Sequence, residues 1–266
     1  LEIYWSSFTG GYASNDGGAV YAEECALEAG SCSFTSNRAD EDGGALSLLS
    51  ASGESSFTSC DFSGNQADAG GGVFAASVSS GLSISDCDFN GNTATTRAGA
   101  FYGFWCDPAA FTGCSFRGNS AISSDFTDCR GGAIYIIGMD PTLTECTIED
   151  NTSGTGGGIY NFQGHPILDG CTVSSNVGKI CGGGMFSDDG VAWLTGTTFC
   201  SNQPDNIIGG WVDQGDNVLS PDCDPGGPLV CVADTNADYN VDVLDLLYVI
   251  AVWNTDNAAG DINEDG

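Results

Sequence analysis

A motif that recurs about every 26 residues constrains the fold of this chain more than any other feature. The motif reads Cys-x-Phe-x-x-Asn and, after a short gap, Gly-Gly followed by a small and then a larger apolar residue. A clear copy begins at Cys114 and Asn119 and continues at Gly131 and Gly132. Eight copies are legible over residues 1–212. A period of this length predicts a stack of similar coils, in which each coil contacts only its neighbours.

The residues within each repeat indicate strands rather than helices. The apolar runs are short, alternate with a period of two, and are bounded by Gly, Asn, Ser and Asp, which is typical of strands. Parallel strands cannot be joined by tight hairpins, so the chain must wind around an axis to stack its coils. The sequence therefore predicts an all-β fold, a right-handed parallel β-helix of about eight coils that are spaced about 4.8 Å apart.

Each repeated position has an expected structural role. Cys and Phe two residues apart share one face of a strand, so both should point inward, with Cys acting as a small buried hydrophobic residue. Asn should lie at a corner, where it tolerates a left-handed backbone and can hydrogen-bond from coil to coil. The glycines should allow positive φ at the next corner, and the small residue should allow close backbone approach. The eighth copy places its second glycine at Gly209 and its larger apolar residue at Trp211. The cysteines are Cys32, Cys60, Cys87, Cys114, Cys146 and Cys171, and the asparagines are Asn37, Asn65, Asn92, Asn119, Asn151, Asn176 and Asn202.

The paired motifs resemble the repeat of chlamydial polymorphic outer membrane proteins. Copies include Gly131-Gly132-Ala133-Ile134 and Phe34-Thr35-Ser36-Asn37, and the resemblance extends over about four fifths of the chain. Proteins with this repeat are exported β-helices that are displayed on the cell surface and are often adhesive. The resemblance therefore implies an extracellular or bacterial cell-surface location.

The C-terminal segment resembles a type I dockerin, a duplicated calcium-loop module that binds cohesin domains. Oxygen donors stand at loop positions 1, 3, 5, 9 and 12 of residues 234–245, which is EF-hand spacing, although Tyr239 replaces the usual glycine. The resemblance implies Ca²⁺ as a cofactor and a cohesin-like partner. The alternative is an acidic surface turn followed by a capping helix. The expected ligands are Asp234, Asn236, Asp238, Asn240, Asp242 and Asp245 in the first loop, and Asp261, Asn263 and Asp265 in the half of a second loop that follows.

The chain is expected to divide into a β-helix over residues 1–220, a linker over 221–232 and the calcium-loop segment over 233–266. Cys223 and Cys231 flank a Pro-Gly-Gly-Pro turn in the linker and form the expected disulfide pair. Thirteen cysteines suggest an oxidising compartment. We expect no membrane span, because the C-terminal apolar stretch is short and is interrupted by a charge.

Net charge restricts the partners. The sequence has 36 acidic residues against 5 basic ones, for a net charge of −31. Such a surface repels nucleic acid and anionic membranes. It favours calcium or basic partners, or it serves only solubility in salt, and the scatter of the acids among outward turns favours solubility.

The sequence favours a non-enzymatic role. Parallel β-helices include polysaccharide lyases and hydrolases, so the fold alone leaves activity open. Lyases need cations to hold acidic polymers, and five scattered basic residues serve this poorly. Hydrolases need paired carboxylates. Asp86 with Asp88, and Asp188 with Asp189, are such pairs, but chance pairs are expected among so many acids. His165 is the single histidine, which removes most nucleophile–base triads.

An aromatic column is the candidate interaction surface. Its residues follow the larger apolar residue of each repeat, so they should point outward if that residue points inward. Rings stacked in this way could bind glycans or a neighbouring subunit. The alternative is that the phase is reversed and the rings belong to the core. Phe126, in the long corner insertion over 120–130, is a further contact candidate. The column comprises Tyr21, Phe74, Tyr102, Tyr135, Tyr160 and Phe186.

Two functions remain open from the sequence. The first is a non-enzymatic structural or interaction protein, used in surface assembly, adhesion or a head-to-tail fibre, with a second copy or another surface protein as its partner. No cap precedes the strand-like residues 1–5 in this sequence, and open strand edges can pair with another chain. The second is a glycan-binding or polysaccharide-cleaving module that is tethered through its dockerin-like tail.

Overall fold

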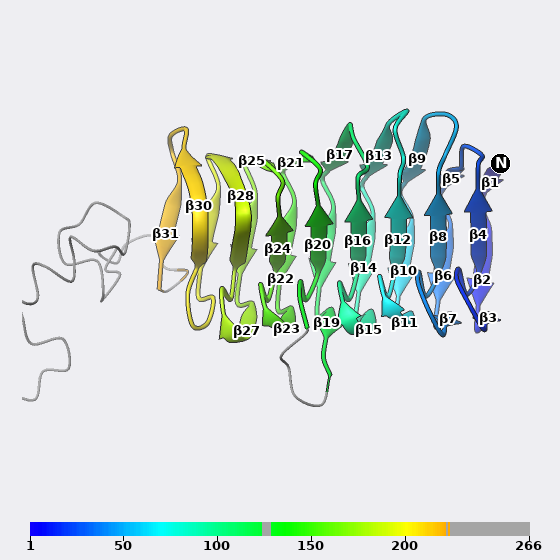
Figure 1. Cartoon of the computed structure of the whole chain (residues 1–266), viewed down its shortest axis with the longest axis horizontal. Helices are drawn as coiled ribbons and strands as arrows, with labels where there is room; N and C mark the ends of the chain where they lie inside the picture. Colours follow the sequence, from blue (N-terminus) through cyan, green and yellow to red (C-terminus); the bar gives the residue numbers. More distant parts are fainter. Residues whose placement is uncertain (124–128, 222, 224–266) are drawn as a thin grey trace, which may run out of the picture.

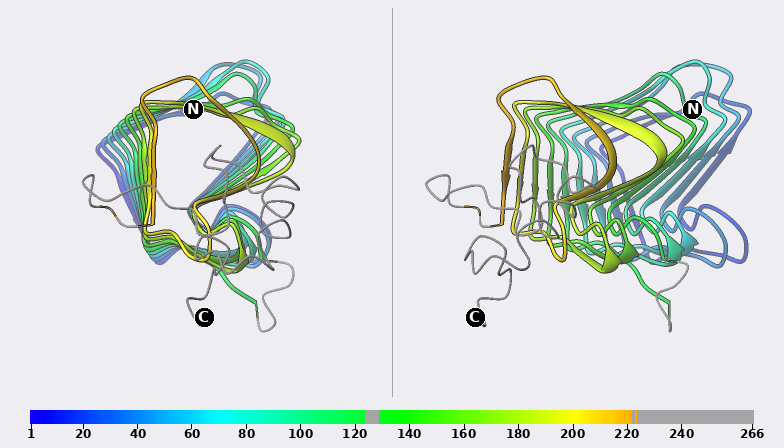
Figure 2. Two further views of the ribbon diagram at one scale, coloured as in Figure 1. Left: turned by 90° about the vertical axis from the view of Figure 1, so that its left-hand side faces the viewer. Right: turned by 60° about the vertical axis from the view of Figure 1, so that its left-hand side comes forward.

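The computed structural model describes residues 1–123, 129–221 and 223, and these residues form a right-handed parallel β-helix (Figure 1). The predicted fold class is confirmed. Four columns of parallel strands run along the axis, and the view down the axis shows the coils superimposed (Figure 2). None of the described residues forms an α-helix, and so that part of the chain has no helical segment suited to crossing a membrane.

Each complete coil contributes one strand to every column in the same order. Column 1 contains β1 (Glu2–Tyr4), β5 (Glu28–Gly30), β9 (Ser55–Thr58), β13 (Leu82–Ser85), β17 (Ala109–Thr112), β21 (Thr142–Thr144), β25 (Ile167–Asp169) and the second half of β28 (Met185–Thr195). Column 2 contains β2 (Ser7–Thr9), β6 (Ser33–Thr35), β10 (Asp61–Ser63), β14 (Asp88–Asn90), β18 (Ser115–Arg117), β22 (Thr147–Glu149), β26 (Thr172–Ser174), β29 (Thr198–Cys200) and β31 (Val218–Ser220).

The other two columns complete the wall. Column 3 contains β3 (Tyr12–Ala13), β7 (Arg38–Ala39), β11 (Gln66–Ala69), β15 (Thr93–Arg97), β19 (Ser120–Ala121), β23 (Thr152–Thr155) and β27 (Val177–Cys181). Column 4 contains β4 (Val20–Glu23), β8 (Leu46–Leu49), β12 (Val73–Ala76), β16 (Phe101–Phe104), β20 (Ile134–Ile137), β24 (Ile159–Phe162) and the first halves of β28 and of β30 (Ile207–Asp213). The second half of β30 pairs with the second half of β28 and so continues column 1. Among the described residues, seven coils have a strand in each of the four columns. The eighth described coil has no strand in column 3, where a single bridge joins Val177 to Gln203.

The final repeat departs from the predicted register. Met185 pairs with Ile207, so Ile207 occupies the position that the sequence assigned to Trp211. Gly209 pairs with Ser187 and Trp211 with Ala192. The physical reason is that β28 continues through the corner between columns 4 and 1, and its partner β30 follows the same path with a register shift. The glycine pair near Gly209 therefore does not mark a repeat.

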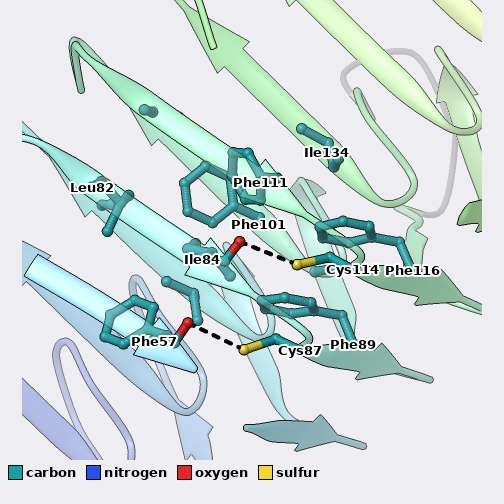
Figure 3. Close-up of a cluster of buried hydrophobic side chains, with 14 of the residues drawn as sticks. Phe57, Leu82, Ile84, Cys87, Phe89, Phe101, Phe111, Cys114, Phe116 and Ile134 are labelled. Atoms are coloured by element: carbon teal, nitrogen blue, oxygen red, sulfur yellow. Dashed lines mark hydrogen bonds between the residues drawn. The ribbon is translucent and has the colours of Figure 1, made fainter. Parts of the chain in front are cut away.

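The predicted Phe column is confirmed. Phe8, Phe34, Phe62, Phe89 and Phe116 stack with ring centroids 4.7–5.0 Å apart, which matches the coil spacing. Ile148, Val173 and Phe199 continue this column toward the C-terminal end. The rings fill the centre of the coils together with the inward residues of columns 1 and 4 (Figure 3).

The Cys column is buried as predicted, but its thiols also make hydrogen bonds. Cys87 Sγ donates to the Phe57 carbonyl at 3.6 Å, and Cys114 Sγ donates to the Ile84 carbonyl at 3.4 Å (Figure 3). Thr197 takes the same place in the eighth coil, and its Oγ1 donates to the Leu168 carbonyl at 3.1 Å. The position therefore requires a small side chain with a donor, which is more specific than a small hydrophobic residue. The six thiols of the column are free.

The Asn ladder is confirmed, with one correction. Each amide nitrogen from Asn37 to Asn176 donates to the amide oxygen of the next coil at 2.9–3.1 Å. The left-handed residue of this corner is the one before each Asn, such as Ser36 at φ 55° and Gly64 at φ 62°. The asparagines are needed for their buried hydrogen bonds rather than for a positive φ.

The two glycines of the pair have different roles. The first supplies the corner, as Gly131 does with φ 68°, and in one coil Ala98 takes this place at φ 53°. The second does not have a positive φ. A Cβ at Gly132 would overlap the carbonyl oxygen of Gly157 and lie 2.7 Å from the Thr152 nitrogen. This position therefore admits only glycine, because the backbones of neighbouring coils touch here.

Candidate functional site

The predicted aromatic column faces out of the coil, but most of it is buried. Phe74, Tyr102, Tyr135 and Tyr160 pair in register along column 4, on the opposite face from the inward core residues. Tyr102 and Tyr135 stack with centroids 5.1 Å apart, and only 3% of Tyr135 is exposed. The sequence left two alternatives, an exposed interaction surface or a place in the core. These four rings fit neither, because they form a second apolar layer outside the main core.

The burial has a visible cause in column 3. Ala69, at the end of β11, and Ala98, just after β15, pack against the rings. Arg130 lies over the Tyr160 ring at 5.4 Å from its centroid. Tyr21 stays 47% exposed because its partner in the next coil is Ser47, which has no ring to cover it. Phe186, at the other end, is half-buried.

The buried phenols are neutral at physiological pH. Burial raises the pKa of Tyr102 to about 12, and the positive charge of Arg97 offsets this only in part. Burial also raises the pKa of Tyr160, as does its 2.8 Å hydrogen bond to Asp188 Oδ2. An ionised phenolate would be poorly solvated in this layer. The rings are suited to packing rather than to proton transfer.

A row of apolar side chains that the sequence analysis overlooked lies beside this layer. Leu49, Phe104, Ile137 and Phe162 are half-buried and pair in one line along column 4, with Ala76 between Leu49 and Phe104. They stand two residues after the aromatic column and so share its outward face. The period-two alternation of the sequence could have revealed this row, because residues two positions apart lie on the same face of a strand.

An exposed tryptophan borders this row. Trp105 is 61% exposed, has a left-handed backbone at φ 51°, and stacks on Phe104 with centroids 4.9 Å apart. Its indole lies over Gly138, where a Cβ would come within 2.6 Å of the ring carbon Cδ1. We call Leu49, Phe104, Trp105, Ile137 and Phe162 the outer strip.

A groove of about 540 Å³ lies at the corner between columns 1 and 2. We call it the corner groove. It extends over the first four coils, from Trp5 in the first to Asp86 and Asp88 in the fourth, and Cys32 and Cys60 of the second and third coils also line it. Serines and three aspartates line it, and none of the lining residues is basic.

Trp5 stands at the N-terminal end of the corner groove and is 84% exposed. Its φ of 52° is left-handed, like that of the residues at this corner in the next coils, which include Ser31, Ser59, Asp86 and Gly113. A side chain in this conformation costs about 1 kcal/mol relative to glycine. The corner can therefore be built without a tryptophan, and the indole gains little burial in return.

The two nominated carboxylate pairs differ in their surroundings. Asp86 and Asp88 both line the corner groove, where Asp61 pairs in register with Asp88. The Ser63 hydroxyl donates to the Asp61 carboxylate. Asp188 instead accepts the hydrogen bond from Tyr160 on the outer face of column 4, and Asp189 follows at a corner with φ 54°. The first pair therefore belongs to the corner groove, and the second lies on the outer face of column 4 and at the corner that follows.

His165 contacts a carboxylate at the surface. Its Nδ1 lies 3.2 Å from Asp140 Oδ1, and its backbone nitrogen donates to the same oxygen at 2.7 Å. Both side chains are more than half exposed. The contact ties a corner of one coil to the next, which gives this histidine a structural role.

The predicted disulfide between Cys223 and Cys231 is wrong, because Cys223 has another partner. Cys223 is bonded to Cys200, at a Cα–Cα distance of 4.9 Å. Cys200 ends β29, and the chain passes it again one coil later, so the two residues become neighbours in the stack. Cys231 lies outside the described residues.

Several predicted site residues also lie outside the described residues. These are Phe126 and all nine expected calcium ligands, from Asp234 to Asp265. Within residues 1–123, 129–221 and 223, no group of three or more His, Cys, Asp or Glu side chains is placed to hold a metal ion.

Comparison with known proteins supports the fold over part of the chain. A family model described as a right handed beta helix region matches residues 111–208. A second model, described as a Chlamydia polymorphic membrane protein repeat, matches residues 31–48. No curated protein and no solved structure matches the chain. Over these two stretches the chain is thus similar to a β-helix and to one repeat of the polymorphic membrane proteins.

Proposed function

We propose that this chain is an extracellular, non-enzymatic β-helix that acts as a rigid interaction module at the bacterial cell surface. The match to a Chlamydia polymorphic membrane protein repeat supports the surface location. The observation that carries an interaction role is the outer strip. Its residues are not needed for the Cys, Phe, Asn and Gly contacts that stack the coils, yet they place a line of apolar side chains on the outer face.

The partner that we assign to the outer strip is a second copy of this chain. The strip runs along the axis over five coils, so two copies can lie flank to flank with the same residues on each side, which is a closed two-fold arrangement. The net charge of −31 on each copy opposes this contact. Salt or calcium should therefore promote the association by screening the repulsion.

Sedimentation velocity at rising protein and salt concentrations tests the assembly. The wild-type chain should form dimers in 0.5 M NaCl, and the variant Phe104→Thr/Trp105→Gly/Ile137→Thr should weaken the dimer about tenfold or more. The matched control is Ile167→Thr/Trp193→Thr, which removes two exposed apolar side chains from column 1. This control should leave the dimer intact. A wild-type chain that stays monomeric at every salt concentration contradicts the proposal. Species that keep growing with concentration would indicate a head-to-tail fibre instead.

We also propose that the C-terminal segment binds Ca²⁺ and, through it, a cohesin-like partner. The support is the EF-hand spacing of Asp234, Asp238 and Asp242. Calorimetry on the full chain should show a calcium site that Asp234→Ala/Asp238→Ala abolishes. The control Asp150→Ala/Asp169→Ala removes the same charge from the β-helix and should retain the site. Equal calcium heats in wild type and in the tail variant would refute it.

Glycan binding is the second candidate function. The corner groove, with its exposed tryptophan and polar walls, favours it independently of the outer strip.

A further inference from the structure

We propose that the corner groove binds a short glycan whose sugars carry free amino groups, with the glycan lying along the axis of the β-helix. This inference rests on the second candidate function, glycan binding, and does not depend on the association of two copies through the outer strip. It rests on the length of the groove, on Trp5 at one end, and on the charge of its walls.

The dimensions of the groove suit a short chain ligand. It extends over four coils, and three steps between coils span about 14 Å. Its volume is about 540 Å³. Ser31 and Ser33 line it in the second coil, and their hydroxyls can each donate and accept hydrogen bonds. A linear ligand rich in hydroxyl and amino groups can find partners in every coil.

Trp5 provides a flat apolar surface at the end of the groove. The ring is 84% exposed, and the corner would be less strained with glycine in its place. A sugar ring has an apolar face of C–H groups that can stack on an indole, and a nearby ammonium group adds cation–π attraction. The tryptophan is therefore best explained by a ligand that lies across it.

The charge of the walls selects among sugars. Asp61, Asp86 and Asp88 line the groove, and no basic residue lines it. Polymers of sugar acids would be repelled by these carboxylates and by the net charge of −31. Amino sugars bring one ammonium per ring, which can make charge-assisted hydrogen bonds with the carboxylates. Neutral sugars can stack on Trp5 but lack this contribution.

Calorimetry with four probes tests the ligand class: a deacetylated glucosamine oligomer, its N-acetylated form, a cello-oligomer and an oligogalacturonate, all of the same length. The glucosamine oligomer should bind best, and its affinity should fall as salt rises. The N-acetylated and cello-oligomers should bind about tenfold more weakly. The oligogalacturonate should not bind. An oligolysine of equal charge is included, and tighter binding of this peptide than of the glycan would overturn the proposal.

Variants separate the groove from general attraction to an acidic protein. Trp5→Gly removes the indole while keeping a residue suited to φ 52°, so the fold should persist and affinity should fall about tenfold. Trp5→Phe should recover part of this affinity. Asp61→Asn/Asp86→Asn/Asp88→Asn should abolish the salt dependence. The control Glu145→Gln/Asp150→Asn/Asp169→Asn changes the net charge equally outside the groove and should bind like wild type. Equal affinities of the groove and control variants would overturn the inference.

Discussion

Replacing Asn119 by alanine should destabilise the β-helix by about 3–5 kcal/mol, because it interrupts a buried ladder in the middle of the stack. Asn119 Nδ2 donates to the Phe89 carbonyl at 2.9 Å and to Asn151 Oδ1 at 3.0 Å. Its Oδ1 accepts from the backbone nitrogen and the side chain of Asn92 at 2.9 and 3.0 Å. The Asn92 nitrogen and the Phe89 carbonyl would be left buried without these partners, which is the costly outcome.

Guanidinium unfolding followed by circular dichroism measures this loss. Asn90→Ala is the matched control, since Asn90 is an exposed asparagine of β14 on a neighbouring coil and should change stability by less than about 0.5 kcal/mol. Asn119→Asp should also be strongly destabilising, because a carboxylate cannot donate to the Phe89 carbonyl or to Asn151 Oδ1. Equal midpoints for Asn119→Ala and Asn90→Ala would show that the ladder contributes little to stability.

Gly132→Ala should be more damaging still and should cost more than about 4 kcal/mol or prevent folding. The added methyl group would overlap the carbonyl oxygen of Gly157 and lie 2.8 Å from the Thr152 carbonyl carbon. Both obstacles are backbone atoms of the next coil, so relief requires the coils to separate. That separation would also weaken the ladder hydrogen bonds on either side.

Gly118→Ala is the matched comparison for Gly132→Ala. Gly118 has a positive φ of 61°, but a Cβ there would find only Asn90 Oδ1 at 4.0 Å. We expect a cost of about 1 kcal/mol, which is the strain of a left-handed alanine. Ala98 already occupies a comparable corner at φ 53°. If the two alanine variants unfold at the same denaturant concentration, close approach of the coils is not what requires Gly132.

The features that the sequence predicts well depend only on neighbouring coils. The Phe column follows from period-two alternation at a fixed repeat position, and the Asn ladder follows from one amide stacking on the next. The burial of Tyr135 and Tyr160 could not be predicted from contacts between neighbouring coils alone. It depends on where the ends of column 3 lie relative to column 4, and the gap between the Asn and Gly motifs varies from coil to coil.

The sequence contained a signal for the correct disulfide, namely the spacing between its two cysteines. Cys200 and Cys223 are 23 residues apart, which is close to one repeat, so the period itself places them side by side. The turn between Cys223 and Cys231 suggested a local pair instead. Trp211 was assigned from the sequence to the wrong repeat position because two glycines near the end of the repeats resemble the glycine pair of the motif. In the structure, β28 and β30 run through this corner as continuous strands, and the glycines do not form a repeat corner. The corner groove could not be foreseen, because Trp5, Asp86 and Asp88, which give it its character, come from different coils and are not part of the repeated motif.

The identical chemistry of each step in the Asn ladder leaves the length of this molecule free. Each coil from that of Asn37 to that of Asn176 offers one amide oxygen to the coil before it and one amide N–H to the coil after it. Removing residues 93–119 would bring Asn92 into the place of Asn119, facing Asn151 with the same groups. A fold of this kind can lengthen or shorten by whole coils through duplication or loss of a single segment of the gene. The span of any surface that it presents can then change without redesign of its interior.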